Sequence, residues 1–373
     1  MPSSSDIHNG LLMWAMKYGV LADDALRDAS QVSGDADLIP FEEQHSNYFR
    51  TRKIVKVEAR KKGSTHTFAL YSRLPIARTK SSTLIKRFNK RYQDQGFLLE
   101  VGVHKPFKID QHIKSTFDPV YYNGDFIACG SSVGLGNQRN AGTLTALGKT
   151  DDGRLIGISC NHVTGGCNTA RPGTPIVVPG IQDVSPEQHE IKVIGVHEFT
   201  GTMSQGLPQI IDFKTNTDIA CFQINEEQGK LLSSMQGSGP KAYDTPTSFA
   251  AVKEGLLVKK WGRTTNCTHG RVKKLVSEPE SIDYKVTSYF GPTSSQVFNG
   301  TVYYKDFYEV ESRGADPFSV GGDSGSLVVT DGKGKEEKVV GILIGGNDSK
   351  SYVLPLKAIL SKLKVTLLNG HNI

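Results

Sequence analysis

Short apolar runs, each bounded by turn-forming residues, dominate the chain after about residue 120. The runs are rich in Val, Ile and Leu and are flanked by Gly, Pro, Asn or Asp; examples are residues 155–158, 175–178, 219–222, 326–329 and 339–344. Runs of this kind predict β-strands joined by tight turns. Strands that recur at short spacing are typical of barrels and sandwiches, so the pattern predicts an all-β fold for this part of the chain.

The first 120 residues follow a different pattern. Apolar residues between positions 11 and 29 recur at helical spacing, with a break near Gly19. Two strand-like runs then form a hairpin pattern, and a helical stretch precedes a third strand-like run; these elements lie at residues 53–59, 66–72, 83–95 and 97–103. The sequence therefore predicts a small α+β module over residues 1–120.

This N-terminal module is strongly basic. Residues 50–94 hold fourteen Lys or Arg residues against two acidic ones, whereas the whole chain has a net charge of only +6. Positive charge is therefore concentrated in one segment. One interpretation is a surface that binds nucleic acid or another acidic ligand. The other, which we favour, is a solvated helix face whose charges dock electrostatically on the acidic remainder of the chain.

The glycine-rich segment GGDSGS at residues 321–326 is the strongest signal for chemistry. A serine hydroxyl becomes a nucleophile when an imidazole takes its proton and a carboxylate orients that imidazole. The chain offers His162 after one apolar run, Asp218 before another, and Ser324 in the glycine-rich turn. A plain loop between strands is the alternative for the glycine-rich turn alone. The three residues together predict a catalytic triad.

The glycines of this turn indicate where negative charge would be stabilised. Acyl transfer places charge on the former carbonyl oxygen, and backbone N–H groups aimed at that oxygen stabilise it. We predict Gly322 and Ser324 as the two N–H donors of an oxyanion hole. Gly325 would leave the nucleophile unobstructed, because glycine carries no side chain.

The segments ISCNHV, TDIACFQI and GGDSGSLVV resemble the His, Asp and Ser motifs of the trypsin-like (chymotrypsin-fold) serine peptidases. The similarity spans about residues 130–368, and the stretch at residues 260–272 is similar to intracellular bacterial members and to plant Narrow-leaf-type proteins. The resemblance implies two six-stranded antiparallel β-barrels with the triad in the cleft between them. Residues 121–373 would then form the peptidase domain, preceded by the α+β module.

The resemblance also implies where the substrate binds. In trypsin-like enzymes the residue six positions before the nucleophile sets the base of the pocket, and here it is Phe318, followed by Ser319. An acid that would select Lys or Arg is missing at that position, which implies an apolar or small side chain before the scissile bond. Ile344, Gly345 and Gly346 would offer backbone with which an extended substrate pairs as an added strand.

Asp323, directly before the nucleophile, bears on activation. In secreted relatives this residue pairs with a newly cleaved N-terminus, yet no Ile-Val-Gly-Gly start follows Arg or Lys at the expected distance before His162. We therefore expect Asp323 to find an internal partner, or the N-terminal module or an external ligand to order the oxyanion loop.

The cysteines and the first residues of the chain indicate the cellular compartment in which the protein is expected. The cysteines are odd in number and do not fall at the disulfide positions usual in secreted relatives; they are Cys129, Cys160, Cys167, Cys221 and Cys267. Zinc at Cys160, Cys167 and His162 is the alternative, but the triad explains this histidine better, so we expect no metal and no cofactor. The first residues lack the pattern of a signal peptide, and no apolar run reaches the length of a membrane span. We expect a cytoplasmic protein with no membrane partner.

These features together predict a cytosolic serine endopeptidase that cleaves a specific protein or peptide substrate. Its N-terminal module, an activating partner or an acidic ligand at that module would regulate it. The alternative is a catalytically inert, protease-like scaffold that binds peptide or nucleic acid.

Overall fold

Two units divide the chain in the computed structural model: Met1–Pro106 with Gly206–Ile211, and Phe107–Gln205 with Asp212–Ile373. From the sequence we placed a boundary at residue 120, and that boundary stays a prediction. The structure describes residues 2–23, 25, 32–104, 107–108, 118–185, 190–206, 210–225, 227, 230–235, 242–332, 336–347 and 349–372.

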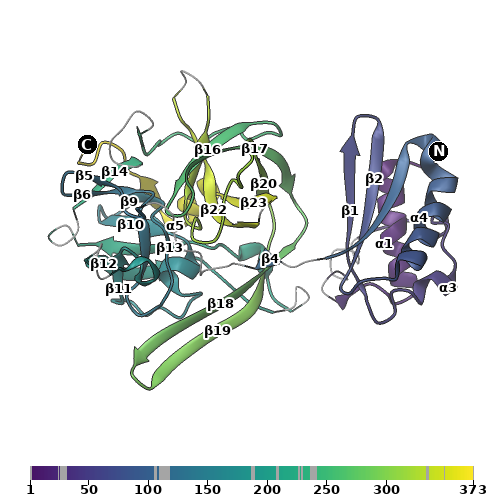
Figure 1. Cartoon of the computed structure of the whole chain (residues 1–373), viewed down its shortest axis with the longest axis horizontal. Coiled ribbons are helices and arrows are strands. Elements are labelled where there is room, and N and C mark those ends of the chain that lie inside the picture. Colours follow the sequence, from purple (N-terminus) through teal and green to yellow (C-terminus); the bar gives the residue numbers. More distant parts are fainter. Residues whose placement is uncertain are drawn as a thin grey trace. The chain divides into compact units, whose positions relative to one another are not determined.

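The first unit combines a small sheet with helices (Figure 1). Strands β1 and β2 form an antiparallel hairpin, and β3 lies parallel to β2 on its other side. Helix α4 packs through side chains four positions apart, namely Leu84, Phe88 and Tyr92. The elements are α1 (Ser4–Lys17), η1 (Ala36–Leu38), α3 (Glu43–Ser46), β1 (Ile54–Lys62), β2 (Thr65–Ser72), α4 (Arg78–Tyr92), η2 (Gln93–Gln95) and β3 (Phe97–Val103).

Helix α1 begins well before the apolar positions from which we predicted it. The Ser3 hydroxyl accepts a hydrogen bond from the Asp6 amide, and the Asp6 carboxylate accepts one from the Ser3 amide. This reciprocal capping satisfies two amides that the first helical turn leaves unpaired. The Ser-x-x-Asp spacing was therefore a readable start signal. Residues 24 and 26–29 of the predicted helical region lie outside the described residues.

Six strands of the second unit close into an antiparallel barrel, in the order β16-β17-β20-β23-β22-β21. Its interior is packed with Val258, Val272, Val310, Val328 and other apolar side chains. Several of these strands match the apolar runs of the sequence. Their bounds are β16 (Leu257–Gly262), β17 (Asn266–Val276), β20 (Phe307–Ser312), β21 (Leu327–Thr330), β22 (Val339–Asn347) and β23 (Lys350–Pro355).

The other large sheet of this unit differs from the six-stranded closed barrel that the resemblance implied. It has eight strands in the order β24-β9-β10-β13-β12-β11-β7-β8, and within the described residues its two ends do not pair. The C-terminal strand β24 occupies the outer edge of β9, with Val365 opposite Thr150, so that edge is not available to close the sheet. The bounds are β7 (Ser132–Leu135), β8 (Gly142–Thr143), β9 (Ala146–Thr150), β10 (Leu155–Ser159), β11 (Pro175–Val178), β12 (Lys192–Thr200), β13 (Ala220–Ile224) and β24 (Val365–Leu367).

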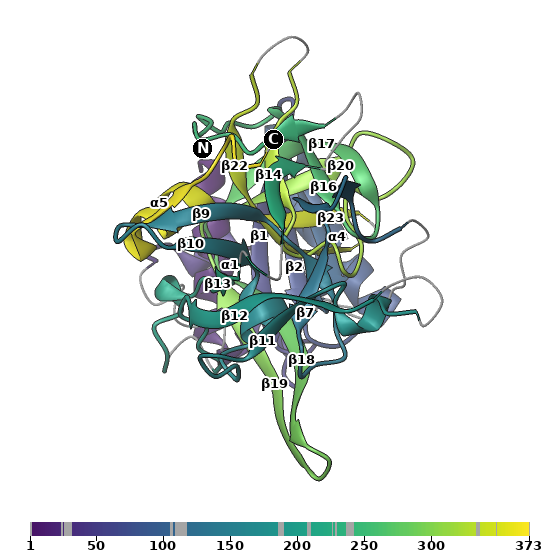
Figure 2. The same ribbon diagram turned by 90° about the vertical axis from the view of Figure 1, so that its left-hand side faces the viewer.

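A long hairpin of β18 and β19 extends away from the sheets of the second unit (Figures 1 and 2). Strand β4 pairs with β18 in parallel near Ile282, and a four-stranded sheet runs β15-β14-β6-β5. No helix in the described part of the chain is long and apolar enough to cross a membrane. The remaining elements are β4 (Phe107–Lys108), β5 (Tyr122–Asn123), β6 (Phe126–Cys129), η3 (Asn161–Gly165), η4 (Ile181–Asp183), η5 (Phe213–Thr215), β14 (Leu231–Met235), β15 (Tyr243–Asp244), β18 (Glu280–Gly291), β19 (Ser294–Tyr304) and α5 (Leu356–Leu363).

Candidate active site

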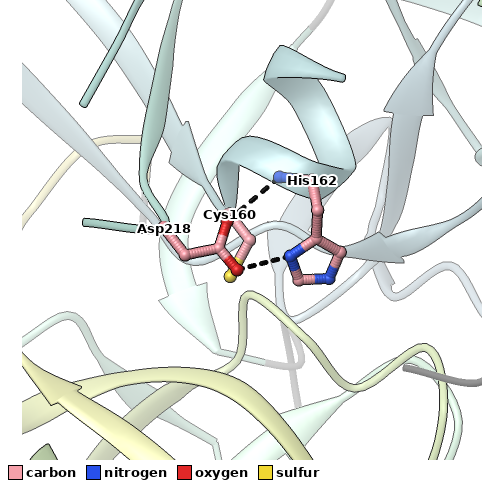
Figure 3. Close-up of side chains that lie close together, drawn as sticks. All are labelled: Cys160, His162 and Asp218. Carbon is pink, nitrogen blue, oxygen red and sulfur yellow. Dashed lines mark hydrogen bonds and ion pairs between the residues drawn. The ribbon is translucent and has the colours of Figure 1, made fainter. Parts of the chain in front are cut away.

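The structure brings His162 and Asp218 into direct contact. His162 lies in the single turn η3, which begins two positions after the end of β10, and Asp218 lies two positions before β13. Because β10 and β13 are antiparallel neighbours, the end of one strand and the start of the other meet at the same edge of the sheet. The Asp218 Oδ2 atom accepts a hydrogen bond of 2.5 Å from His162 Nδ1, and Oδ1 accepts one of 3.0 Å from the His162 amide (Figure 3).

Asp218 fixes the tautomer of the imidazole. A carboxylate only accepts hydrogen bonds, so the proton lies on Nδ1 of His162 and Nε2 presents its lone pair. Both side chains are almost completely withdrawn from solvent, with exposed fractions of 2% and 0%. The pair thus has the arrangement of a general base held by an orienting carboxylate.

A tyrosine that the sequence did not single out completes the surroundings of Asp218. The Tyr284 hydroxyl, on β18, donates to Asp218 Oδ2 at 3.0 Å, and a hydrogen bond of 2.9 Å joins it to the Tyr304 hydroxyl. Burial, and then the charge of Asp218, raise the pKa of Tyr284 well above its ordinary value, so the hydroxyl stays a donor. The sequence contained no signal for Tyr284. The alternation of apolar and polar residues along a strand indicates which side chains are buried, but not which group a buried hydroxyl bonds to.

Replacing Tyr284 by Phe is expected to slow reaction at the site by about ten- to hundredfold, because a hydrogen bond to a charged group contributes about 1.5–3 kcal/mol. The rate of phosphonylation of Ser324 by a fluorophosphonate measures this effect. Tyr304→Phe is the matched control, since it removes a buried hydroxyl that has no hydrogen bond with Asp218 among the described residues. Equal rate losses in the two variants, with equal losses of stability, would show that Tyr284 only supports the fold.

Ser324 lies in a loop that is hydrogen-bonded to the sheet carrying His162. The Thr143 amide on β8 donates to the Ser324 carbonyl at 2.8 Å, and the Thr143 hydroxyl donates to the Gly322 carbonyl at 3.1 Å. Gly142 contacts both parts of the site: a Cβ there would lie 2.4 Å from Val163 and 3.0 Å from the Ser324 carbonyl oxygen. The loop that carries Ser324 therefore packs beside the turn that carries His162.

The hydrogen bonds among the described residues do not include one between His162 Nε2 and the Ser324 hydroxyl. In substrate-free enzymes such bonds are often long and shorten when the substrate binds. The role of Ser324 as nucleophile is accordingly a proposal, which we develop below.

The amides of Gly322 and Ser324 are left available by the loop. Among the described residues neither amide donates a hydrogen bond, whereas the Asp323 amide between them donates to the Val320 carbonyl at 3.1 Å. Gly322 has a φ of +93°, and a Cβ there would lie 2.1 Å from the Arg263 guanidinium. Only glycine fits this position. Its φ and close packing are therefore enough to explain why residue 322 is glycine, without any catalytic role.

Gly325 is required by close packing as well. Its φ is +95°, and a Cβ would lie 2.2 Å from the Thr143 carbonyl oxygen. The sequence suggested that this glycine leaves room for the substrate. In the structure it allows the loop to approach β8.

Asp323 has an internal partner. Its Oδ2 atom lies 3.2 Å from Lys260 Nζ, and both side chains are fully buried. The carboxylate also accepts hydrogen bonds from the amides of Thr264 and Thr265, at 3.0 and 3.1 Å. Burial lowers the pKa of Lys260, while the charge of Asp323 opposes this shift. The loop is thus held by a charge pair made within the chain, which is one of the alternatives that we expected.

The predicted pocket residues lie around one end of the barrel. Phe318 is 2% exposed and packs in the barrel core, and the Ser319 hydroxyl lies 2.6 Å from that of Ser351. Their role in selecting a substrate side chain stays a prediction.

The segment from Ile344 to Gly346 lies on β22, where Gly345 and Gly346 pair with β23 on one side. On the other side, the pairs with β21 end at Ile342. Within the described residues, this leaves a strand edge beside the loop that carries Ser324.

Cys160, His162 and Asp218 are grouped closely enough to hold a metal ion, since their ligand atoms lie within 4.8 Å of one another (Figure 3). The Cys160 thiol, however, donates to the Leu343 carbonyl at 3.3 Å, and burial raises its pKa well above the ordinary value. A metal ligand must be a thiolate. A thiol that keeps its proton makes the cluster of Cys160, His162 and Asp218 a poor metal site. The Asp218 carboxylate is also already hydrogen-bonded to His162 and Tyr284.

The chain is similar to several solved structures at low sequence identity. Protease A of Thermobifida fusca is 14% identical, and the match covers 65% of this chain and 100% of that one with a TM-score of 0.40. A glutamic-acid-specific serine protease is 21% identical over 65% and 100% of the two chains, with a TM-score of 0.40. A chymotrypsin of Cellulomonas bogoriensis is 15% identical over 65% and 97%, with a TM-score of 0.38. Because these TM-scores are low, we infer nothing from the likenesses. No protein-family model and no curated protein matches the chain.

Proposed function

We propose that the second unit is a serine peptidase in which Ser324 is the nucleophile and His162 the general base. The observation that carries the proposal is the buried Asp218–His162 pair, packed beside a loop whose Gly322 and Ser324 amides are available. Binding alone does not require an imidazole that a buried carboxylate holds in one tautomer. Catalysis by proton transfer does require such an imidazole.

The proposed reaction follows from these positions. His162 Nε2 takes the proton of the Ser324 hydroxyl while the oxygen attacks the carbonyl carbon of the substrate. The amides of Gly322 and Ser324 stabilise the negative charge on the carbonyl oxygen. His162 then gives the proton to the leaving amine, and a water molecule releases the acyl group by the same steps. Asp218 stays ionised throughout and stabilises the imidazolium.

The form of the substrate site supports a peptide substrate. The edge of β22 at residues 344–346 is unpaired on the β21 side within the described strands. An extended peptide can add to such an edge through main-chain hydrogen bonds. An endopeptidase needs this mode of binding, because it recognises chain on both sides of the scissile bond.

Fluorophosphonate labelling tests the proposal on the full chain. We expect one adduct on Ser324, located by peptide mapping, and none on Ser324→Ala with the same near-ultraviolet circular dichroism. No adduct on the wild type, with a folded and monodisperse sample, would favour the inert scaffold instead.

We propose further that the protein acts in a reducing compartment such as the cytosol. All five cysteines lie in the described part of the chain and none of them is in a disulfide there, and disulfides are typical of oxidising compartments. Fractionation of cells that express the tagged protein tests this location.

The basic face of α4 supports a recruiting or regulatory role for the first unit. Arg78–Tyr92 contains six Lys or Arg residues and no acid. Leu84, Phe88 and Tyr92 are buried, which leaves Lys86 and Lys90 exposed. We propose that this face binds an acidic protein partner.

Binding of the full chain to a fluorescent poly-glutamate probe is expected to weaken steeply with added salt and to be lost in the double variant Lys86→Glu and Lys90→Glu. Single-stranded DNA is tested beside it. Tighter binding of DNA would favour nucleic acid as the partner, and salt-independent binding of the acidic probe would remove the proposal.

A further inference from the structure

Cys267 differs from the other four cysteines in both exposure and neighbours. Cys129, Cys160, Cys167 and Cys221 are buried, whereas Cys267 is partly exposed. It lies on β17 two positions before His269, so the two side chains lie on the same face of the strand. The Sγ atom of Cys267 is 3.9 Å from Nε2 of His269.

A carboxylate orients this histidine. Asp331 follows β21, and its amide donates to the Leu257 carbonyl on β16 at 2.9 Å, which brings it to the same face as His269. Asp331 Oδ2 lies 2.9 Å from His269 Nδ1 and 3.0 Å from the Arg313 guanidinium. Since the carboxylate accepts, Nδ1 carries the proton of the neutral imidazole, and in that tautomer the lone pair is on Nε2, the atom nearest the thiol.

The thiol and the imidazole open into a cavity. The cavity has a volume of about 870 Å³ and is lined by Leu257, Cys267, Thr268, His269, Pro317 and Asp331 among others. Cavities that bind small molecules have volumes of about 300–1,000 Å³. A molecule of this size can therefore reach the sulfur atom beside its base.

We propose that Cys267 is a nucleophilic thiol, activated by His269 and Asp331, that exchanges with low-molecular-weight disulfides such as glutathione disulfide. His269 Nε2 takes the proton of the thiol, and the thiolate attacks one sulfur of the disulfide. A bond forms between Cys267 and that sulfur while the S–S bond of the reagent breaks. The departing thiolate takes the proton from His269 and leaves as a thiol, so Cys267 is oxidised and half of the reagent is reduced.

This site shares no residue with the proposed peptidase site. None of its three groups contacts His162, Asp218 or Ser324 through a hydrogen bond among the described residues. Its test does not depend on peptidase activity. The two proposals can therefore succeed or fail separately.

The test uses the full chain, reduced and desalted, with glutathione disulfide at neutral pH, followed by intact-mass spectrometry and peptide mapping. We expect a single adduct, on Cys267, and none on Cys267→Ser. His269→Ala and Asp331→Asn are expected to lower the rate at least about tenfold, because each removes part of the general base. Asp331→Glu, which keeps the carboxylate, is expected to retain more of the rate than Asp331→Asn.

A denatured sample controls for thiol content, since all five cysteines should then react in every variant that keeps them. Three results would overturn the proposal. One is modification of a buried cysteine before Cys267. Another is a rate that is unchanged in His269→Ala while the fold is retained. The third is tight binding of Zn²⁺ by the wild type but not by Cys267→Ser, without disulfide exchange.

Discussion

Asp218→Asn is expected to lower the rate of Ser324 phosphonylation by about 10⁴-fold, with little change in the fold. An asparagine at this position would present its amide group to His162 Nδ1, where the carboxylate now accepts at 2.5 Å. The imidazole would then carry its proton on Nε2 and could not take one from Ser324. The loss therefore arises from the wrong tautomer and not from a missing nucleophile.

Two controls accompany this measurement. Asp212→Asn changes an acid that caps η5 and is expected to react at the wild-type rate. Ser324→Ala lacks the hydroxyl that is labelled and therefore gives the background of the measurement. An Asp218→Asn rate within about tenfold of the wild type would remove Asp218 from the proposed mechanism.

Lys260→Met is expected to lower the free energy of unfolding by about 3–5 kcal/mol, because it leaves the buried carboxylate of Asp323 without its cation. The Lys260 ammonium lies 3.2 Å from Asp323, with both side chains 0% exposed. It also donates to the Asn266 carbonyl at 3.4 Å. Methionine fills a similar volume, so lost packing contributes little. Urea unfolding followed by circular dichroism measures the change.

The exposed pair Lys17–Asp37 supplies the matched control. Its side chains are 53% and 83% exposed, and Lys17→Met is expected to change stability by less than about 1 kcal/mol. We also expect Lys260→Met to slow Ser324 phosphonylation, since Asp323 lies between the two proposed oxyanion donors. A variant as stable as the wild type would show that the amides of Thr264 and Thr265 hold Asp323 without the cation.

Strand positions were largely predictable because apolar runs and turn residues act locally. The runs at residues 155–158, 175–178 and 339–344 all lie in strands. The hairpin at residues 53–72 was predicted for the same reason. In contrast, closure of a sheet is not local. Whether β9 ends at an open edge or pairs with β24 depends on a strand more than two hundred positions later in the chain.

Lys260 shows why the charged partner of Asp323 could not be predicted from the sequence. It lies in Leu257–Gly262, where neighbouring side chains alternate between the two faces of the strand. Barrel closure buries Lys260, while its neighbour Lys259 stays partly exposed and pairs with Glu337 at 2.7 Å. Two adjacent lysines thus take opposite faces, and only the position of Asp323 in the folded chain decides which one is buried.

The order of His162, Asp218 and Ser324 and the glycines around the serine were set by the sequence alone, because spacing and backbone freedom are local properties. The contact between His162 and Asp218, the support from Tyr284 and the cation for Asp323 were decided by the tertiary structure. Each of these interactions joins segments that are distant in the chain, and their side-chain partners follow from how the strands pair and not from residue type.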